Sequence, residues 1–345
     1  MLDRNYADFA WEQAAELLAI DSPTGFTARA AAWVKEAFEN LGYSARYTRK
    51  GSVLIDLGGE DDENGLLLAA HTDTLGGMVS LIKGNGRLKI TNLGGMRPDN
   101  GETENVRVYT RSGNVIEGTL QLCNASVHVN TDYKVQRTFD NTEIVLDEDV
   151  NSADDTRALG IEVGDFVCFD PRTRRTASGY LKSRFLDDKL SVGVLLGFAK
   201  YLADNQITLK RRTWIHVTVY EEVGHGGSAS VPAGITEAIS VDMGCVGDGL
   251  GCTEKKVSIC AKDSGGPYCY EVVGKLIAAA KKTGADYAVD VYPYYSSDVD
   301  VTLGSGHDIR HGLIGPGVYA SHGYERSHID GVYNTIKVLC GYLEV

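Results

Sequence analysis

The order of hydrophobic and polar positions predicts an α/β fold at the start of the chain. Two helical patterns, residues Tyr6–Ile20 and Thr27–Leu41, are separated by the turn-forming run Asp21–Gly25. Short strand patterns follow, and then residues Leu66–Ala70 form an apolar run without alternation. Such a run is typical of a parallel strand that is buried on both faces.

The middle of the chain has a different pattern. From Met78 to Asp170 the chain shows short alternating runs, many glycines and threonines, and little helical periodicity, which predicts an all-β insertion, most simply a small barrel. Helical periodicity returns at Asp187, and Thr213–Tyr220 and Ala238–Val241 have the pattern of buried strands. The predicted domains are a discontinuous catalytic domain, residues 1–76 and 179–345, and an inserted barrel domain, residues 77–178.

Composition and charge narrow the functions that remain. The chain has 345 residues and a formal net charge of −13, and an acidic surface repels phosphate backbones, so nucleic acid is not an expected partner. No apolar run approaches the length that spans a bilayer, and the first ten residues lack a basic signal region. The seven cysteines are scattered without a CxxC pair, which is typical of a reducing compartment. We therefore expect a soluble cytoplasmic protein without a membrane partner.

Polar side chains follow the predicted strands at the points where the strands end. His71 and Asp73 come directly after the apolar run, and Glu221 and Glu222 come directly after the strand pattern Thr213–Tyr220. In open α/β sheets, functional groups gather just outside the carboxyl ends of the strands. The remaining candidates are Asp187 and Asp188 at a helix start, Asp242 at the end of a further strand, and the late histidines His322 and His328.

Each of these clusters has a structural explanation when it is taken alone. A His-x-Asp run can be a hydrogen-bonded pair, an Asp-Asp pair can cap a helix, and a Glu-Glu pair can lie on a solvated face. The clusters here border buried segments, where a charge is costly unless it is paired or bound to a metal. Carboxylates and imidazoles without thiolates suit Zn²⁺, Mn²⁺ or Co²⁺. Two such ions, ~3.5–4 Å apart and bridged by one carboxylate, would polarise a carbonyl and lower the pKa of a shared water molecule.

Four motifs, in the same order, resemble those of the TET-type or glutamyl aminopeptidases, which are metallopeptidases of clan MH. The resemblance covers essentially the whole chain. It implies a three-layer α/β/α catalytic domain with a mixed, mostly parallel sheet, interrupted by a small barrel-like dimerisation domain. The motifs are Ala70-His71-Thr72-Asp73-Thr74-Leu75-Gly76, Leu186-Asp187-Asp188-Lys189, Glu221-Glu222-Val223-Gly224 and Val241-Asp242.

The resemblance also implies a set of metal ligands. His71 and Asp242 would hold one ion, and Glu222 and a late histidine would hold the other. Asp187 would bridge both ions, and relatives achieve this with a cis peptide bond to Asp188. The cofactor would be two divalent ions per subunit, with Zn²⁺ as the first choice and Co²⁺ or Mn²⁺ as alternatives.

Catalysis and assembly follow from the same resemblance. Glu221 would be the general base, and Asp73 would be the carboxylate that orients the metal-bound imidazole. The implied activity is hydrolysis of N-terminal residues from short peptides with a free N-terminus, through a metal-activated water. The family's insert serves dimerisation, so we expect a homo-oligomer that is at least a dimer, with a tetrahedral dodecamer as the larger form.

The late ligand has two candidates. His328 lies in Arg326-Ser327-His328, a partial echo of the family's R-Y-x-H. His322 follows the apparent strand Gly312–Tyr319 after a short link, and Glu325 comes three places later, as in the clan's H-x-x-E ending. We therefore predict that His322 is the ligand.

The sequence departs from the family pattern in two segments. Ser296–Asp300 replaces the usual G-T-D-A and Tyr319–Gly323 replaces R-Y-x-H-S, so the side-chain preference of a relative does not transfer to this chain.

Three other functions compete with the aminopeptidase interpretation. The first rival is a clan-related two-metal deacylase or dipeptidase. The second is a metal-free glycosidase with paired carboxylates, which would leave the histidines without a task. The third is a non-enzymatic binding protein built on a decayed hydrolase. This alternative is disfavoured, because every ligand position is present in the sequence.

Overall fold

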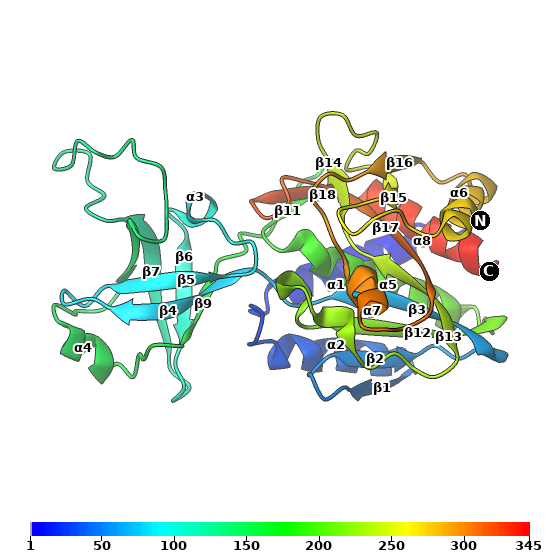
Figure 1. The fold of residues 1–345 in the computed structure, drawn as a ribbon, viewed down its shortest axis with the longest axis horizontal. Helices are drawn as coiled ribbons and strands as arrows, with labels where there is room; N and C mark the ends of the chain where they lie inside the picture. The colour runs from blue at the N-terminus through cyan, green and yellow to red at the C-terminus, as the bar shows by residue number, and fades with distance from the viewer. Residues whose placement is uncertain (1) are drawn as a thin grey trace.

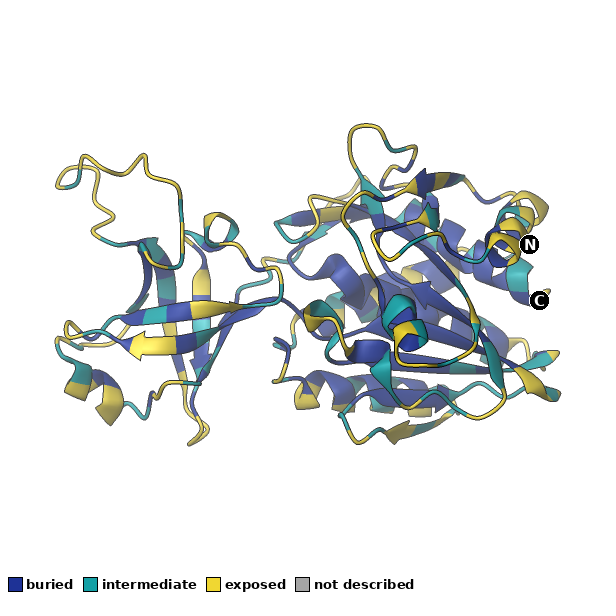
Figure 2. Cartoon of the chain, in the orientation of Figure 1, coloured by how far each residue is buried: buried dark blue, intermediate teal, exposed yellow. Residues whose placement is uncertain are grey.

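The computed structural model describes residues 2–345 and shows two bodies joined by a narrow connection (Figure 1). The larger body carries both chain ends and a large mixed sheet, and the smaller body is a barrel. Buried side chains fill the space between the layers of the larger body, whereas the outer loops of the barrel are exposed (Figure 2). No helix within residues 2–345 combines the length and the apolar character needed to cross a membrane.

The central strands of the large sheet pair in parallel. Strands β12 (Arg211–Thr218), β3 (Asp61–His71), β13 (Ile235–Val241) and β17 (Arg310–Tyr319) are neighbours in this order. The apolar half of β3, Leu66–Ala70, is buried throughout, as expected for a strand with a parallel neighbour on each side. The flanking strands are β1 (Ser44–Tyr47), β2 (Val53–Asp56), β10 (Arg174–Arg175), β11 (Tyr180–Ser183), β14 (Gly244–Val246), β15 (Val257–Lys262), β16 (Tyr287–Val291) and β18 (Glu325–His328).

Helices cover both faces of this sheet and complete the three layers. Helix α1 packs against α5, and both contact α8, whereas α7 contacts β3, β13 and β17 and lies in front of the sheet in Figure 1. The close approach of α1 and α5 needs a glycine, because a Cβ on Gly193 would lie 2.5 Å from the carbonyl oxygen of Ala10. The helices are α1 (Asn5–Leu18), α2 (Ala28–Asn40), α5 (Leu186–Asp204), α6 (Tyr270–Thr283), α7 (Asp298–Gly304), α8 (Ile329–Leu343) and the 3-10 helices η1 (Glu221–Val223) and η2 (Gly226–Ser228).

The insertion forms a closed antiparallel barrel with the strand order β4–β5–β8–β7–β6–β9. Its sequence also forms two short helices, α3 (Pro98–Gly101) and α4 (Ala153–Ala158), which the strand-like pattern did not predict. The predicted architecture, a three-layer α/β/α domain interrupted by a small barrel, is confirmed. The barrel strands are β4 (Gly76–Ile82), β5 (Leu88–Leu93), β6 (Asn105–Tyr109), β7 (Val115–Leu122), β8 (Thr142–Leu146) and β9 (Phe166–Phe169).

Candidate metal centre

The candidate residues meet at the carboxyl edge of the central strands. His71 is the last residue of β3, and Asp242 directly follows β13. Glu221 and Glu222 begin η1, a short distance after the end of β12. Because β12, β3 and β13 are adjacent and parallel, their ends bring these side chains to one place. Asp187 enters the same place from the first turn of α5.

Two groups of side chains have ligand atoms close enough to share a cation. The first group is His71, Asp187 and Asp242, the second is Asp187, Glu222 and His322, and the ligand atoms of each group lie within 4.8 Å of one another. Nε2 of His71 is 3.2 Å from Oδ1 of Asp187. Nε2 of His322 is 3.3 Å from Oδ2 of the same carboxylate. The structure thus brings the five predicted ligands together, with the two oxygens of Asp187 facing two different imidazoles.

The two groups are crowded with buried carboxylates. The side chains of Asp187 and Glu222 are 10% and 3% exposed. Burial raises the pKa of Asp242 to about 7 and raises the pKa of Glu222 well above its usual value. Burial opposes the charge of His322, but its hydrogen bond to Asp187 and the nearby Glu222 raise the pKa of this imidazole to about 10. Carboxylates this close together are costly without cations, so the donor set fits divalent ions.

Asp73 holds several parts of the site through hydrogen bonds. Its buried carboxylate accepts from the main-chain N–H groups of Glu221 (3.2 Å) and Glu222 (3.3 Å) and from the hydroxyl of Thr24 (2.6 Å). Its main-chain carbonyl lies 2.9 Å from Nδ1 of His71, whereas its carboxylate oxygen lies 3.6 Å from the same atom. Nδ1 of His71 therefore donates to the carbonyl, which leaves Nε2 for an ion. The carboxylate itself mainly anchors the start of η1.

Main-chain contacts around Asp187 involve two further carboxylates. The peptide bond between Asp187 and Asp188 is cis, as the family resemblance implies. Oδ2 of Asp188 accepts from the N–H of His71 at 3.2 Å. One oxygen of the buried Glu325 accepts from the N–H of Asp187 at 3.1 Å, and the other accepts from the N–H of His322 at 2.9 Å. The sequence pattern draws attention to Glu325 only through its spacing from His322, and no local signal shows that it reaches Asp187.

A cavity of about 770 Å³ opens beside the two ligand groups. This volume is within the usual range for small-ligand sites. Part of its wall is Tyr294–Ser296, and Ser296 is also the first residue of the segment where the chain departs from the family's G-T-D-A. Gly95 and Arg97 of the barrel body also line the cavity. Both bodies therefore contribute to the space in which a substrate would bind.

The two late histidines occupy different environments. His328 ends β18 and is the N-cap residue of α8, where its Nδ1 accepts from the N–H of Asp330 at 3.0 Å and its Nε2 lies 2.8 Å from the carbonyl oxygen of Ser178. Both ring nitrogens of His328 are therefore engaged. Nε2 of His322, in contrast, lies 3.5 Å from Oε2 of Glu222. Of the two, His322 is the one placed to bind an ion.

We expect His322→Ala to reduce the metal occupancy of the group that contains Glu222, because one of its three donors is lost. His328→Ala should keep full metal occupancy and instead destabilise the fold by about 0.5–2 kcal/mol, the usual cost of losing a helix cap. Elemental analysis and thermal unfolding of both variants measure these effects. If His328→Ala alone lowered the metal content, the assignment of the late ligand would be wrong.

Comparisons with known proteins agree with the fold. Residues 51–338 match the family model described as M42 glutamyl aminopeptidase. YhfE of Bacillus subtilis, whose name places it among the aminopeptidases, is 43% identical over 330 residues, which is 95% of each chain.

Two solved structures share the fold. A TET aminopeptidase from a marine sediment Thaumarchaeota archaeon superposes with a TM-score of 0.87 and 20% identity, over 98% of this chain and 96% of that one. The TET1 peptidase of Pyrococcus horikoshii, which can assemble into a tetrahedron or a large octahedral shell, superposes with a TM-score of 0.84 and 20% identity, over 97% of this chain and 99% of that one.

Because the family model matches most of the chain and the bacterial relative matches nearly all of it, this protein belongs to the M42 glutamyl aminopeptidase family and is a peptide hydrolase.

Proposed function

We propose that the protein is an aminopeptidase that holds two divalent metal ions and hydrolyses the N-terminal residue from short peptides. The observation that carries this proposal is the position of Asp187, which is a member of both ligand groups. Its Oδ1 faces His71 of one group and its Oδ2 faces His322 of the other. A carboxylate in that position is the expected bridge of a two-metal site. The carboxylate of Glu221 lies close by, with Oε2 3.6 Å from Nε2 of His71.

The ligand chemistry supports two ions. The carboxylates of Asp187, Glu222 and Asp242, together with that of Glu221, would carry four negative charges, which two divalent cations would balance. Carboxylate and imidazole donors favour Zn²⁺ and also accommodate Co²⁺ or Mn²⁺. When bound, the ions would polarise the scissile carbonyl and lower the pKa of the attacking water.

Glu221 is the residue that we assign as the general base. It is a member of neither ligand group, although it is adjacent in sequence to the ligand Glu222. Its N–H is anchored by the carboxylate of Asp73, which fixes the start of η1 beside the cavity. From this position the Glu221 carboxylate would take a proton from the attacking water and return it to the departing amine.

A substrate panel tests the proposed function. The protein should release the chromophore from aminoacyl-anilides with a free amino group, and it should leave the matching N-acetylated anilides and N-acyl amino acids intact. A clan-related deacylase would show the opposite preference, and a dipeptidase would accept dipeptides but not anilides. A glycosidase would hydrolyse aryl glycosides with or without a chelator. Turnover of N-acyl substrates alone would overturn the proposal.

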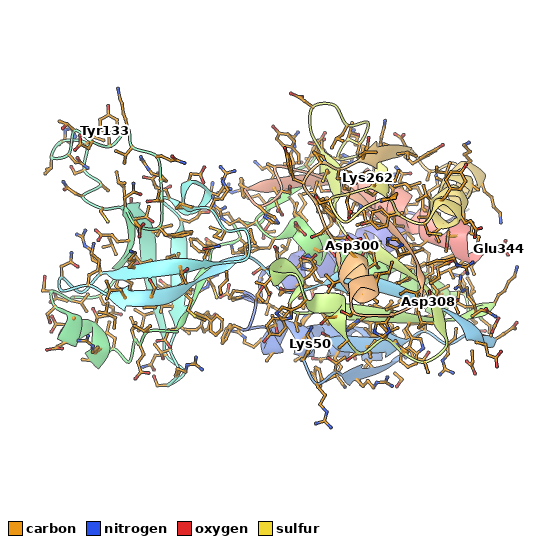
Figure 3. The ribbon with its side chains drawn as sticks, viewed as in Figure 1. Lys50, Tyr133, Lys262, Asp300, Asp308 and Glu344 are labelled. Carbon is orange, nitrogen blue, oxygen red and sulfur yellow. The ribbon has the colours of Figure 1, made fainter. Side chains whose placement is uncertain are left out.

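We further propose that the inserted barrel makes most of the interface of a homo-oligomer that is at least a dimer. Exposed apolar side chains on its long loop support this: Val127 is 60% exposed and Val129 is 75% exposed. Tyr133 on the same loop lies far from the larger body (Figure 3). The TET1 neighbour of the same fold can assemble into a tetrahedron. Buried apolar surface is the main source of association free energy in such contacts.

Light scattering at micromolar concentration should therefore give a dimer or a larger assembly, up to a dodecamer. Val129→Asp should weaken this assembly, because it places a charge in the proposed interface. Val289→Asp, the same substitution at an exposed valine of the larger body, serves as the matched control and should leave the mass unchanged. A monomeric wild-type protein would contradict the proposal.

A further inference from the structure

His322 is the candidate ligand with the least support from regular structure. It lies between β17 and β18, and its φ is +61°, with Ala320 close by at +60°. Residues other than glycine rarely adopt this left-handed conformation, so the surrounding contacts have to hold the turn. The His322 side chain is also 40% exposed, far more than those of Asp187 and Glu222. The position of its imidazole therefore depends on what packs around the turn.

The barrel body supplies two of the contacts that hold this turn. Nδ2 of Asn100, in α3, donates to the main-chain carbonyl of His322 at 2.8 Å, although the two residues are 222 positions apart. Gly95 lies against the imidazole ring, because a Cβ on Gly95 would be 2.5 Å from Nδ1 of His322 and 2.9 Å from its Cε1. The larger body holds the opposite side, where Glu325 accepts from the N–H of His322. Main-chain groups on both sides of the ligand are thus held in place.

Helix α3 is itself fixed to the barrel. A Cβ on Gly101 would lie 2.8 Å from the ring of Phe169 and 3.0 Å from Leu120, so α3 sits directly on the barrel core. Just after α3, Glu104 forms a buried ion pair with Arg184 at 2.7 Å, three residues before Asp187 in the chain. Asn100 therefore projects from a platform that is tied both to the barrel and to the start of α5.

We propose that the inserted barrel helps to position the metal ligand His322. Asn100 and Gly95 are the positioning residues, because they contact the turn that carries His322. This inference rests on the proposed two-metal function, and it assigns the insert a task beyond assembly. Groups that orient a metal ligand typically change metal affinity by about 10–100-fold when they are removed. Loss of the Asn100 contact frees the His322 carbonyl and lets the turn relax, so the effect falls on the ion shared by His322 and Glu222.

The test is a zinc titration of chelator-treated, full-length protein by calorimetry, with wild type, Asn100→Ala, Asn100→Asp and Asn114→Ala. Asn100→Ala should weaken binding of one of the two ions by about 10–100-fold and leave the other unchanged. Asn100→Asp should be at least as weak, because its carboxylate would face the His322 carbonyl. Asn114→Ala removes a similar amide-to-carbonyl contact, to Leu159 at 3.3 Å, within the barrel and should behave as wild type. At saturating zinc, kcat of the Asn100 variants should return close to the wild-type value.

Several results would overturn the inference. If either Asn100→Ala or Asn100→Asp bound both ions with wild-type affinity, the hydrogen bond from Asn100 would not position the ligand. An equal loss in Asn114→Ala would show a general loosening of the barrel instead. A wild-type protein that binds fewer than two ions would refute the proposed function itself. If both Asn100 variants fail to fold, the same titration of Gly95→Ala decides the question, because a wild-type result there would equally exclude the barrel from the site.

Discussion

Glu221→Gln should lower kcat by about 10²–10⁴-fold, the contribution typical of a general acid–base group. The amide of glutamine has almost the same shape as the carboxylate, but it cannot take the proton from the attacking water. Glu221 is a member of neither ligand group, so the variant should keep its full metal content and a KM close to that of wild type. Steady-state kinetics on an aminoacyl-anilide and elemental analysis of the same preparation measure both effects.

Glu222→Gln is the matched comparison for this prediction. It makes the same chemical change at the adjacent position, but Glu222 shares a ligand group with Asp187 and His322. This variant should therefore lose metal as well as activity, and excess metal should restore part of the activity. A Glu222→Gln variant with full metal content, next to a Glu221→Gln variant without it, would show that the roles of the two glutamates are reversed.

Removal of the metal ions should abolish aminopeptidase activity and destabilise the fold. The crowded carboxylates would repel one another once the cations that balance them are gone. At a metal concentration 100 times the dissociation constant, each ion contributes about 2.7 kcal/mol to the free energy of unfolding. Treatment with a chelator should therefore lower the Tm, and addition of Zn²⁺, Co²⁺ or Mn²⁺ should restore both Tm and activity.

Two outcomes would contradict the role of the metals. Peptide hydrolysis that survives complete removal of metal would exclude the proposed mechanism. A Tm that is the same with and without metal would show that the two ligand groups do not bind ions in the folded protein. A chelator pre-saturated with Zn²⁺ provides the control for direct effects of the chelator on the protein, because it has no capacity left to remove metal.

The parts of the site that the sequence predicts are those tied to strand ends. The buried run Leu66–Ala70 and the strands that end before Glu221 and Asp242 are visible as patterns, so their last residues are predictable. Once parallel neighbours bring those ends together, the geometry of the site follows from the topology. The barrel is predictable for a similar reason, because alternation over short runs marks antiparallel strands.

Several other parts of the structure have no comparable local signal. Strands β15 and β16 and helix α7 are short and were not predicted. Helix α6 was not predicted either, although it does carry a local signal, because Val272, Val273, Leu276 and Ala280 repeat at helical spacing. The role of Asn100 depends on a contact across 222 positions, which a single sequence does not reveal. The same holds for Glu325, which joins Asp187 to His322 through main-chain groups alone. Long-range contacts of this kind are set by tertiary packing and not by local propensity.

Each chain should bind two divalent ions, one on each of the two ligand groups that share Asp187. Elemental analysis of the wild-type protein, saturated with Zn²⁺ and then freed of excess metal by gel filtration, measures this stoichiometry. We expect two ions per chain. A value of one ion or fewer per chain under saturating metal would contradict it.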